Sequence, residues 1–290
     1  MTDHPTHWTL DDIPWGSFDP SKVDPKMLSI VKGAAMVEHN GGVYADYLSS
    51  VFHDDPEFQK AAQRWGAEEV QHGKALARWA KLVDPNFDFE TRFADFSSKI
   101  TLPTTADRSV RGSRCGELVA RCMVEVGTSS YYTALREATD EPVLRAICHN
   151  IARDEIRHYK LFYTHLARYH EIERLGIIRR IAVGISRMSE SEDDELAYAY
   201  YAANNVGEPY DRKKCFRAYM SRAYGYYRPH HVERGLTLIF KAVGLKPHAK
   251  LTSWSAKLAC HFLNFKSDQR TSTVHQVMRQ RLARTPSPTR

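Results

Sequence analysis

Apolar residues recur every three to four positions along most of the chain, and few stretches alternate with period two. This spacing puts apolar side chains on one face of a helix, so it predicts an all-α protein. Three predicted helices begin where proline follows an acidic residue, at Asp24-Pro25, Asp55-Pro56 and Glu141-Pro142, because proline is favoured at the first helical position. The pattern predicts long helices over 25–53, 56–83, 107–138 and 142–170.

A polar stretch over 84–106, with prolines at 85 and 103, separates the second and third long helices. We interpret it as a long crossover connection. Beyond residue 170 the pattern predicts shorter helices, and Gly207-Glu208-Pro209 and Lys246-Pro247 punctuate them. These helices cover 171–188, 192–204, 212–224, 229–243 and 247–265. We expect the tail 284–290 to be disordered.

The first 170 residues contain one arrangement of glutamate and histidine twice. Glu38 precedes the stretch Glu69-Val-Gln-His72 by 31 residues, and Glu125 precedes the stretch Glu155-Ile-Arg-His158 by 30. A single Glu-x-x-His match is expected by chance in a chain with 14 histidines. Two matches, each preceded by a glutamate on a predicted apolar helix at nearly the same interval, are a much more specific signal than solvent-facing charges.

This spacing suits a metal site. Positions i and i+3 lie on one helix face, so the glutamate and histidine of each Glu-x-x-His can bind one metal ion together. A glutamate from each of two further helices completes a mixed oxygen and nitrogen set suited to two iron or manganese ions. Without a metal, each carboxylate buried among helices would cost on the order of several kcal/mol in desolvation.

Three motifs resemble a known family. The stretch from Trp65 to Gly73 (WGAEEVQHG) resembles a W-x-A-E-E-x-R-H-G signature, and the stretch from Ile151 to His158 (IARDEIRH) resembles I-A-x-D-E-x-R-H. Glu125-Val-Gly-Thr128 matches a third motif, E-x-x-T. Over about 25–170 the chain therefore resembles the ferritin-like di-iron carboxylate superfamily, and within it the soluble acyl-carrier-protein desaturases.

The resemblance implies a ferritin-like four-helix bundle over 25–170, preceded by an N-terminal extension over 1–24. Additional helices would follow over 171–283, basic from residue 212, and the tail over 284–290 would end the chain. The resemblance also implies the metal ligands, with Glu69 and Glu155 as bridges between the two metals. The implied ligands are Glu38, Glu69, His72, Glu125, Glu155 and His158.

Three neighbouring residues have implied roles and simpler alternatives. Asp154 would be the hydrogen-bond partner of a ligand histidine and fix its tautomer, or else a surface acid. Thr128, one turn after Glu125, would lie beside the dioxygen site and deliver a proton, or would only bond back to the carbonyl of Val124. Trp65 would relay electrons to the metals or, as we favour, fill the core.

Two adjacent glycines, Gly41 and Gly42, stand inside the first predicted helix, one turn after Glu38. A glycine inside a helix costs ~1 kcal/mol relative to alanine. We therefore expect close helix packing at this point, or space for oxygen and a substrate channel.

Charge is distributed unevenly along the chain. The net charge is +6, but from Arg212 to the end 17 Lys and Arg accompany only Glu233 and Asp268, a net charge of +15. The first 211 residues consequently carry −9. Such asymmetry concerns partners rather than fold. The basic region would contact an acidic carrier protein or electron donor, anionic lipid or RNA, unless it is simply a solvated surface.

The predicted helix over 247–265 has one apolar stripe with lysines beside it. This is the pattern of a helix on a membrane surface, and equally of a helix that covers the bundle, which we favour. The stripe consists of Leu251, Trp254, Leu258, Phe262 and Phe265.

Composition excludes several classes of protein. The chain is 42% hydrophobic and 26% charged, which is typical of a soluble globular protein and not of a fibre or a disordered chain. No apolar run approaches the roughly 18 residues of a spanning helix, and the polar N-terminus does not resemble a signal peptide. The five cysteines form no CxxC pair, which argues against a rubredoxin-type site. We expect a cytoplasmic location, with peripheral contact at the inner membrane face through the basic region as a variant.

Together these features predict an oxygen-dependent di-iron oxidoreductase, a desaturase or monooxygenase that acts on an acyl or other lipid-like chain. Electrons would come from an external ferredoxin or flavoprotein, and the family suggests a homodimer. A first alternative is a tRNA-modifying di-iron hydroxylase, although the chain has no RNA-binding motif and we do not expect a nucleic-acid partner. A second alternative is a metal-handling protein of the ferroxidase, peroxidase or storage type.

Overall fold

The computed structural model describes residues 7–190, 194–204 and 207–246. Within these ranges the chain forms α-helices and three short 3-10 turns (Leu10–Asp12, Trp15–Ser17 and Pro20–Lys22), and no β-strand. The all-α class predicted from the sequence is therefore confirmed. None of the helices in the described part is both long and apolar enough to cross a membrane. The predicted helix over 247–265 and the tail over 284–290 lie outside the described residues.

The three helix starts predicted from proline are confirmed. Helices α1 (Pro25–His39), α3 (Pro56–Val83) and α6 (Pro142–Glu173) each begin at such a proline. In each case the acidic residue before the proline caps the helix: Asp24 accepts from the Lys26 N–H, Asp55 from the Phe58 N–H, and Glu141 from the N–H groups of Val143 and Leu144. These carboxylates satisfy amides that have no partner within the helix.

Several predicted boundaries were wrong. The helix predicted over 171–188 begins at Ile177, because α6 continues to Glu173. The helix over 25–53 is divided at Asn40 into α1 and α2 (Gly41–Val51). The crossover contains a further helix, α4 (Phe89–Lys99), whose first turn is capped by the Asp88 carboxylate. The third long helix, α5 (Arg114–Ala138), begins seven residues later than predicted, where the Ser113 hydroxyl accepts from the Gly116 N–H. The last two errors arose because a capping side chain, and not the hydrophobic pattern, determines where each of these two helices begins.

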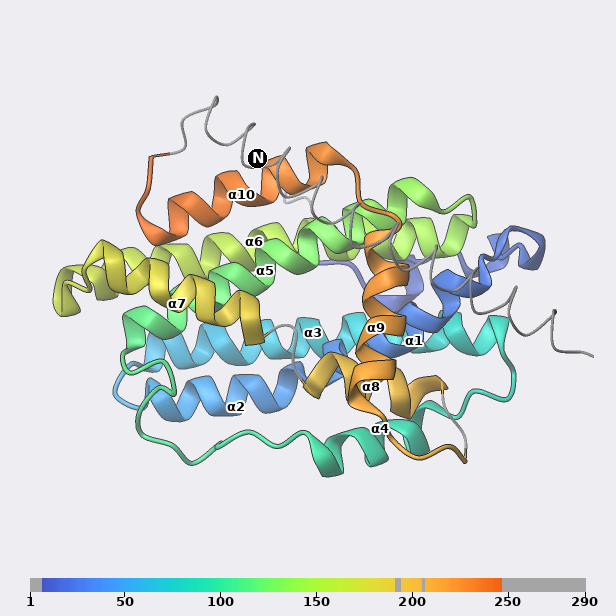
Figure 1. Ribbon diagram of the computed structural model, residues 1–290, viewed down its shortest axis with the longest axis horizontal. Helices are drawn as coiled ribbons and strands as arrows, with labels where there is room; N and C mark the ends of the chain where they lie inside the picture. Colours follow the sequence, from blue (N-terminus) through green and yellow to red (C-terminus); the bar gives the residue numbers. More distant parts are fainter. Residues whose placement is uncertain (1–6, 191–193, 205–206, 247–290) are drawn as a thin grey trace, which may run out of the picture.

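After α6 the chain forms α7 (Ile177–Glu190), α8 (Asp194–Asn204), α9 (Arg212–Tyr224) and α10 (Pro229–Val243). In Figure 1, α5 and α6 run side by side, with α10 along one side of the pair and α3 along the other. Helices α1 and α2 both pack on α3, and α8 and α9 cover α1. The additional helices thus pack against the long ones rather than forming a separate body.

Two apolar clusters lie along the long helices. One contains Trp79 of α3 and Ile147 of α6, and the other contains Trp65 of α3 and Phe162 of α6. The residues of α3 and α6 that lie between these clusters in sequence are the two Glu-x-x-His motifs. The fold therefore places the predicted metal ligands in a polar layer between two apolar regions.

Candidate metal centre

Four helices bring the six predicted ligands together. Glu38 lies near the end of α1, Glu125 lies on α5, and the Glu-x-x-His pairs lie on α3 and α6. None of the six is more than 6% exposed. They form two groups of four, and in each group the candidate ligand atoms lie within 4.8 Å of one another. The groups are Glu38, Glu69, His72 and Glu155, and Glu69, Glu125, Glu155 and His158.

In each group an imidazole nitrogen faces three carboxylates. The Nδ1 atom of His72 lies 3.4 Å from Glu38 Oε2, 3.5 Å from Glu69 Oε2 and 3.3 Å from Glu155 Oε1. The Nδ1 atom of His158 lies 2.9 Å from Glu69 Oε1, 3.4 Å from Glu125 Oε2 and 4.0 Å from Glu155 Oε1. Because the two groups repeat one arrangement, they have the form expected of two adjacent metal positions.

Glu69 and Glu155 belong to both groups. Glu69 directs one oxygen to each histidine, Oε2 to His72 and Oε1 to His158. Glu155 directs Oε1 between the two rings, whose centroids are 5.8 Å apart. Glu38 and Glu125 each belong to one group only. This geometry suits Glu69 and Glu155 as the bridging ligands and Glu38 and Glu125 as terminal ones.

The buried polar atoms at the centre fit a cation better than they fit one another. Within the described residues, the Nδ1 atoms of His72 and His158 have no hydrogen-bond partner, and neither do Glu69 Oε1, Glu125 Oε2 and Glu155 Oε1. Such unpaired buried atoms are rare and costly. Two divalent cations would supply partners for all of them and would balance the charge of the four carboxylates.

The pKa shifts have the same origin. Burial, reinforced by the charge of Glu69, raises the pKa of Glu38 well above its usual range and that of Glu155 to about 8. Burial alone would also raise the pKa of Glu69, but the two flanking imidazoles hold it well below its usual value. Hydrogen bonds to the surrounding carboxylates raise the pKa of both histidines, although burial lowers it. Without a metal the centre therefore retains protons at neutral pH.

Each of the two histidines also hydrogen-bonds a further acid through the ring nitrogen that faces away from the centre. The Nε2 of His72 donates to Asp154 Oδ2 over 3.1 Å, and the Nε2 of His158 donates to Glu68 Oε2 over 2.8 Å. These bonds put the proton on Nε2 and leave Nδ1 free to bind a metal. Arg157 joins the two acids, at 2.9 Å from Asp154 and 2.6 Å from Glu68. The predicted contact of Asp154 with a ligand histidine is thus present in the structure.

Thr128 and Trp65 also lie beside the centre. The Thr128 hydroxyl is 3.1 Å from the carbonyl oxygen of Val124, and it also hydrogen-bonds the Glu155 carboxylate. The bond back to the Val124 carbonyl is therefore present, and the same hydroxyl also contacts a candidate metal ligand. Trp65 is buried and packs edge-on against His158, within the second apolar cluster. This is the core-filling arrangement.

Sequence reasoning missed three residues at the centre. Glu68 precedes Glu69 as Asp154 precedes Glu155, so the repeat itself contained a signal for Glu68. Trp8 donates its indole N–H to Asp154 over 2.7 Å, and the Tyr132 hydroxyl donates to Glu38 over 2.6 Å. No local pattern marks these two contacts, because they connect residues 146 and 94 positions apart.

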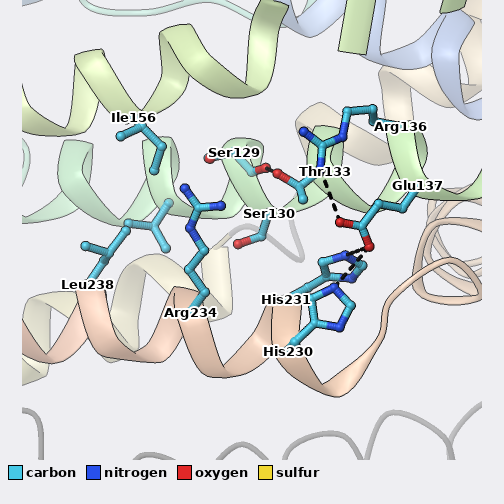
Figure 2. A pocket seen from close by; sticks show the side chains of 11 residues that line it. Ser129, Ser130, Thr133, Arg136, Glu137, Ile156, His230, His231, Arg234 and Leu238 are labelled. Atoms are coloured by element: carbon cyan, nitrogen blue, oxygen red, sulfur yellow. Dashed lines mark hydrogen bonds and ion pairs between the residues drawn. The ribbon is translucent and has the colours of Figure 1, made fainter. Parts of the chain in front are cut away.

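A third group of metal-ligand type, Glu137, His230 and His231, lies where α10 begins beside the end of α5 (Figure 2). Both histidine Nε2 atoms lie near Glu137 Oε2, at 3.0 and 2.9 Å. However, the Nδ1 of His231 accepts the Arg228 backbone N–H over 3.0 Å. The Nε2 of His231 therefore carries the proton and donates to Glu137, so it offers no lone pair to a metal. We interpret this group as a hydrogen-bonded cap of α10.

Comparisons with known proteins add no relative. No model of a known protein family matches the chain, and no curated protein matches its sequence.

Proposed function

We propose that the chain is a ferritin-like di-iron carboxylate protein that catalyses an oxygen-dependent oxidation. One observation carries this proposal: two overlapping groups of buried Glu and His share Glu69 and Glu155, and in the described part of the chain several of their inward-facing atoms lack hydrogen-bond partners. The ligand set of four carboxylates and two imidazoles is typical of paired iron or manganese in helical bundles. The sequence resemblance over 25–170 supports the same family.

A pair of reduced irons held at this centre would supply two of the electrons that reduce dioxygen, and the C–H bond of the substrate, which is oxidised, would supply the other two. The protein's own residues have separate tasks. Asp154 and Glu68 hold the two imidazoles in the tautomer that binds metal. Tyr132 fixes the terminal carboxylate of Glu38. Thr128 would exchange a proton with the buried Glu155 carboxylate, to which its hydroxyl is hydrogen-bonded.

The substrate class and partners in this proposal rest on the resemblance. The substrate is an acyl or other lipid-like chain, and the outcome is desaturation or hydroxylation, since one oxidant serves both. A ferredoxin or flavoprotein supplies the electrons, and the protein is a homodimer. The apolar clusters on both sides of the centre are compatible with an apolar substrate and would keep water from the reacting atoms.

The test is metal loading followed by oxygen exposure. Protein loaded anaerobically with Fe(II) is expected to bind two irons per chain and to consume oxygen when a reductant is added. Glu69→Gln, which keeps the size of the side chain, is expected to lower the stoichiometry to one or none. The thermal melting temperature of each variant shows whether the protein remains folded.

The matched control is His230→Asn, which removes an exposed member of the third group and leaves the buried centre intact. Its iron stoichiometry should equal that of the wild type. Iron that survives Glu69→Gln but not His230→Asn would contradict the proposal. Continuous oxidation of Fe(II) to a ferric core, without a requirement for reductant, would instead identify a ferroxidase or storage protein.

A further inference from the structure

Helix α6 carries a row of basic side chains on a face other than the one that carries its candidate metal ligands. His149, Arg153, Arg157 and Lys160 follow one another at intervals of four, four and three residues. This spacing places them on one face of the helix. The metal-facing residues, including Glu155 and His158, lie on another face. The row therefore lies on another face of α6 than Glu155 and His158, and only its member Arg157 also contacts the acids behind the candidate ligands, Asp154 and Glu68.

This basic row forms one side of a groove. The groove has a volume of about 350 Å³, and its other walls come from Thr133 and Arg136 of α5 and Arg234 of α10. A smaller cavity of about 90 Å³ adjoins it and shares Thr133, Arg136 and Arg234. Figure 2 shows Arg234 extending from α10 towards α5, next to Ser130. Among the described residues, none that lines the larger groove is acidic.

The positive charges of the groove are only partly neutralised. Arg157 pairs with Asp154 and Glu68, and Arg136 pairs with Glu137 at 3.2 Å. In the described part of the chain, Arg153, Lys160 and Arg234 have no acidic partner within 4 Å. The sequence beyond the described residues, 247–290, contains a single acid, Asp268, against eight Lys and Arg.

The positive charge of the groove also affects the pKa of a histidine that lines it. Burial lowers the pKa of His149, and the charges of Arg136 and Arg153 lower it further. Three helices thus bring cations to one concavity, and in the described part of the chain only Arg136 and Arg157 of these cations have acidic partners. Such an arrangement is unfavourable for folding through like-charge repulsion and favourable for an anion that binds from solution.

We infer that this groove binds the phosphate group of a small molecule. Guanidinium groups match phosphate oxygens with two parallel hydrogen bonds, and Lys160 adds a point charge. The volume suits a small ligand rather than a flat protein surface. Ala152 and Ile156 line the same groove and offer apolar contact to the rest of the ligand. This site goes beyond the proposed oxidation and does not depend on it.

The test is calorimetric titration of the full-length, metal-free protein with inorganic pyrophosphate at low salt. The triple variant Arg153→Gln/Lys160→Gln/Arg234→Gln is expected to bind at least tenfold more weakly than the wild type. The matched control is Lys60→Gln/Arg64→Gln/Lys81→Gln, which removes the same charge from exposed positions of α3. It is expected to retain at least half of the wild-type affinity. Unchanged circular dichroism spectra exclude misfolding of either variant.

Two calorimetric results would overturn the inference: no saturable binding to the wild type, or equal weakening in both triple variants, which would mean a general charge effect. Sedimentation with phosphatidylglycerol vesicles provides the second arm. Vesicle binding that depends on the groove, without binding of soluble pyrophosphate, would assign it to a lipid surface and overturn the small-molecule proposal. Iron stoichiometry is measured in parallel, so that failure of the groove is distinguished from failure of the metal centre.

Discussion

At the residue scale, the two histidines of the candidate metal centre depend on acids that lie outside the two ligand groups. Asp154 and Glu68 each accept the Nε2 proton of one ring, and Arg157 connects them. Without such an acceptor, an imidazole loses its fixed tautomer and orientation. The orientation of both imidazole rings therefore depends on side chains just outside the centre.

We predict that Glu68→Gln weakens metal binding about 10- to 100-fold while leaving the protein folded. The amide keeps the size of the carboxylate but removes its charge and its preference for accepting the His158 proton. The measurement is competition for Fe(II) or Mn(II) with a chelator of known affinity. Glu57→Gln is the control on the same helix, because the Glu57 side chain is 81% exposed. Equal affinity in both variants would show that Glu68 does not position His158.

Much of this centre could be predicted from residues alone, for a specific physical reason. A helix places i and i+3 on one face regardless of its surroundings, so two Glu-x-x-His motifs and two single glutamates indicate six converging side chains. Trp8 and Tyr132 could not be found in this way. Their contacts with Asp154 and Glu38 depend on how distant segments pack, and no local spacing encodes that packing.

At the element scale, the break between α1 and α2 is a feature that the hydrophobic pattern alone could not predict. Hydrophobic spacing runs through Asn40 without interruption, yet the chain approaches α3 too closely there for a side chain. A Cβ atom built on Gly41 would lie 2.2 Å from the Cβ of Glu69, and one on Gly73 would lie 2.6 Å from the His39 backbone nitrogen. Of the two readings of Gly41, close packing is the one that the structure supports.

We predict that Gly41→Ala destabilises the protein by about 3 kcal/mol or more, because the new methyl group must displace Glu69 or separate two packed helices. Gly42→Ala is the matched control. Its nearest neighbour is Val70 at 3.6 Å, an ordinary contact, so this variant should change stability by no more than about 1 kcal/mol. Chemical unfolding with urea measures both. Similar stability of the two variants would contradict the close approach of Gly41.

At the scale of the whole molecule, the buried apolar clusters stabilise the fold, and the buried polar layer between them destabilises it. Two hydrophobic clusters hold the long helices together, and a layer of carboxylates and imidazoles lies between them. In the metal-free protein this layer can stay buried only by holding protons, as the raised pKa values of Glu38, Glu155 and both histidines indicate. A metal bound here would therefore compete with protons for one set of atoms.

This competition predicts how stability depends on pH. A folded-state pKa above the unfolded value means that the folded protein binds more protons, so its stability is lost as pH rises towards the folded pKa. The pKa of Glu155 is raised to about 8, and its ordinary value is 4.5. The histidines whose pKa burial lowers, His39, His149, His165 and His231, titrate below this range and do not contribute.

We predict that the metal-free protein becomes less stable from pH 7 to pH 8, by at most about 1.4 kcal/mol per pH unit for each proton released. Two equivalents of Mn(II), which is stable in air, should raise the stability and remove most of this slope, because metal then replaces the protons. Urea unfolding at several pH values measures both curves. Glu155→Gln should flatten the metal-free slope, since the amide does not titrate. Metal-free stability that rises over this range would mean that the buried carboxylates are already ionised, and the cation would then be needed for folding itself.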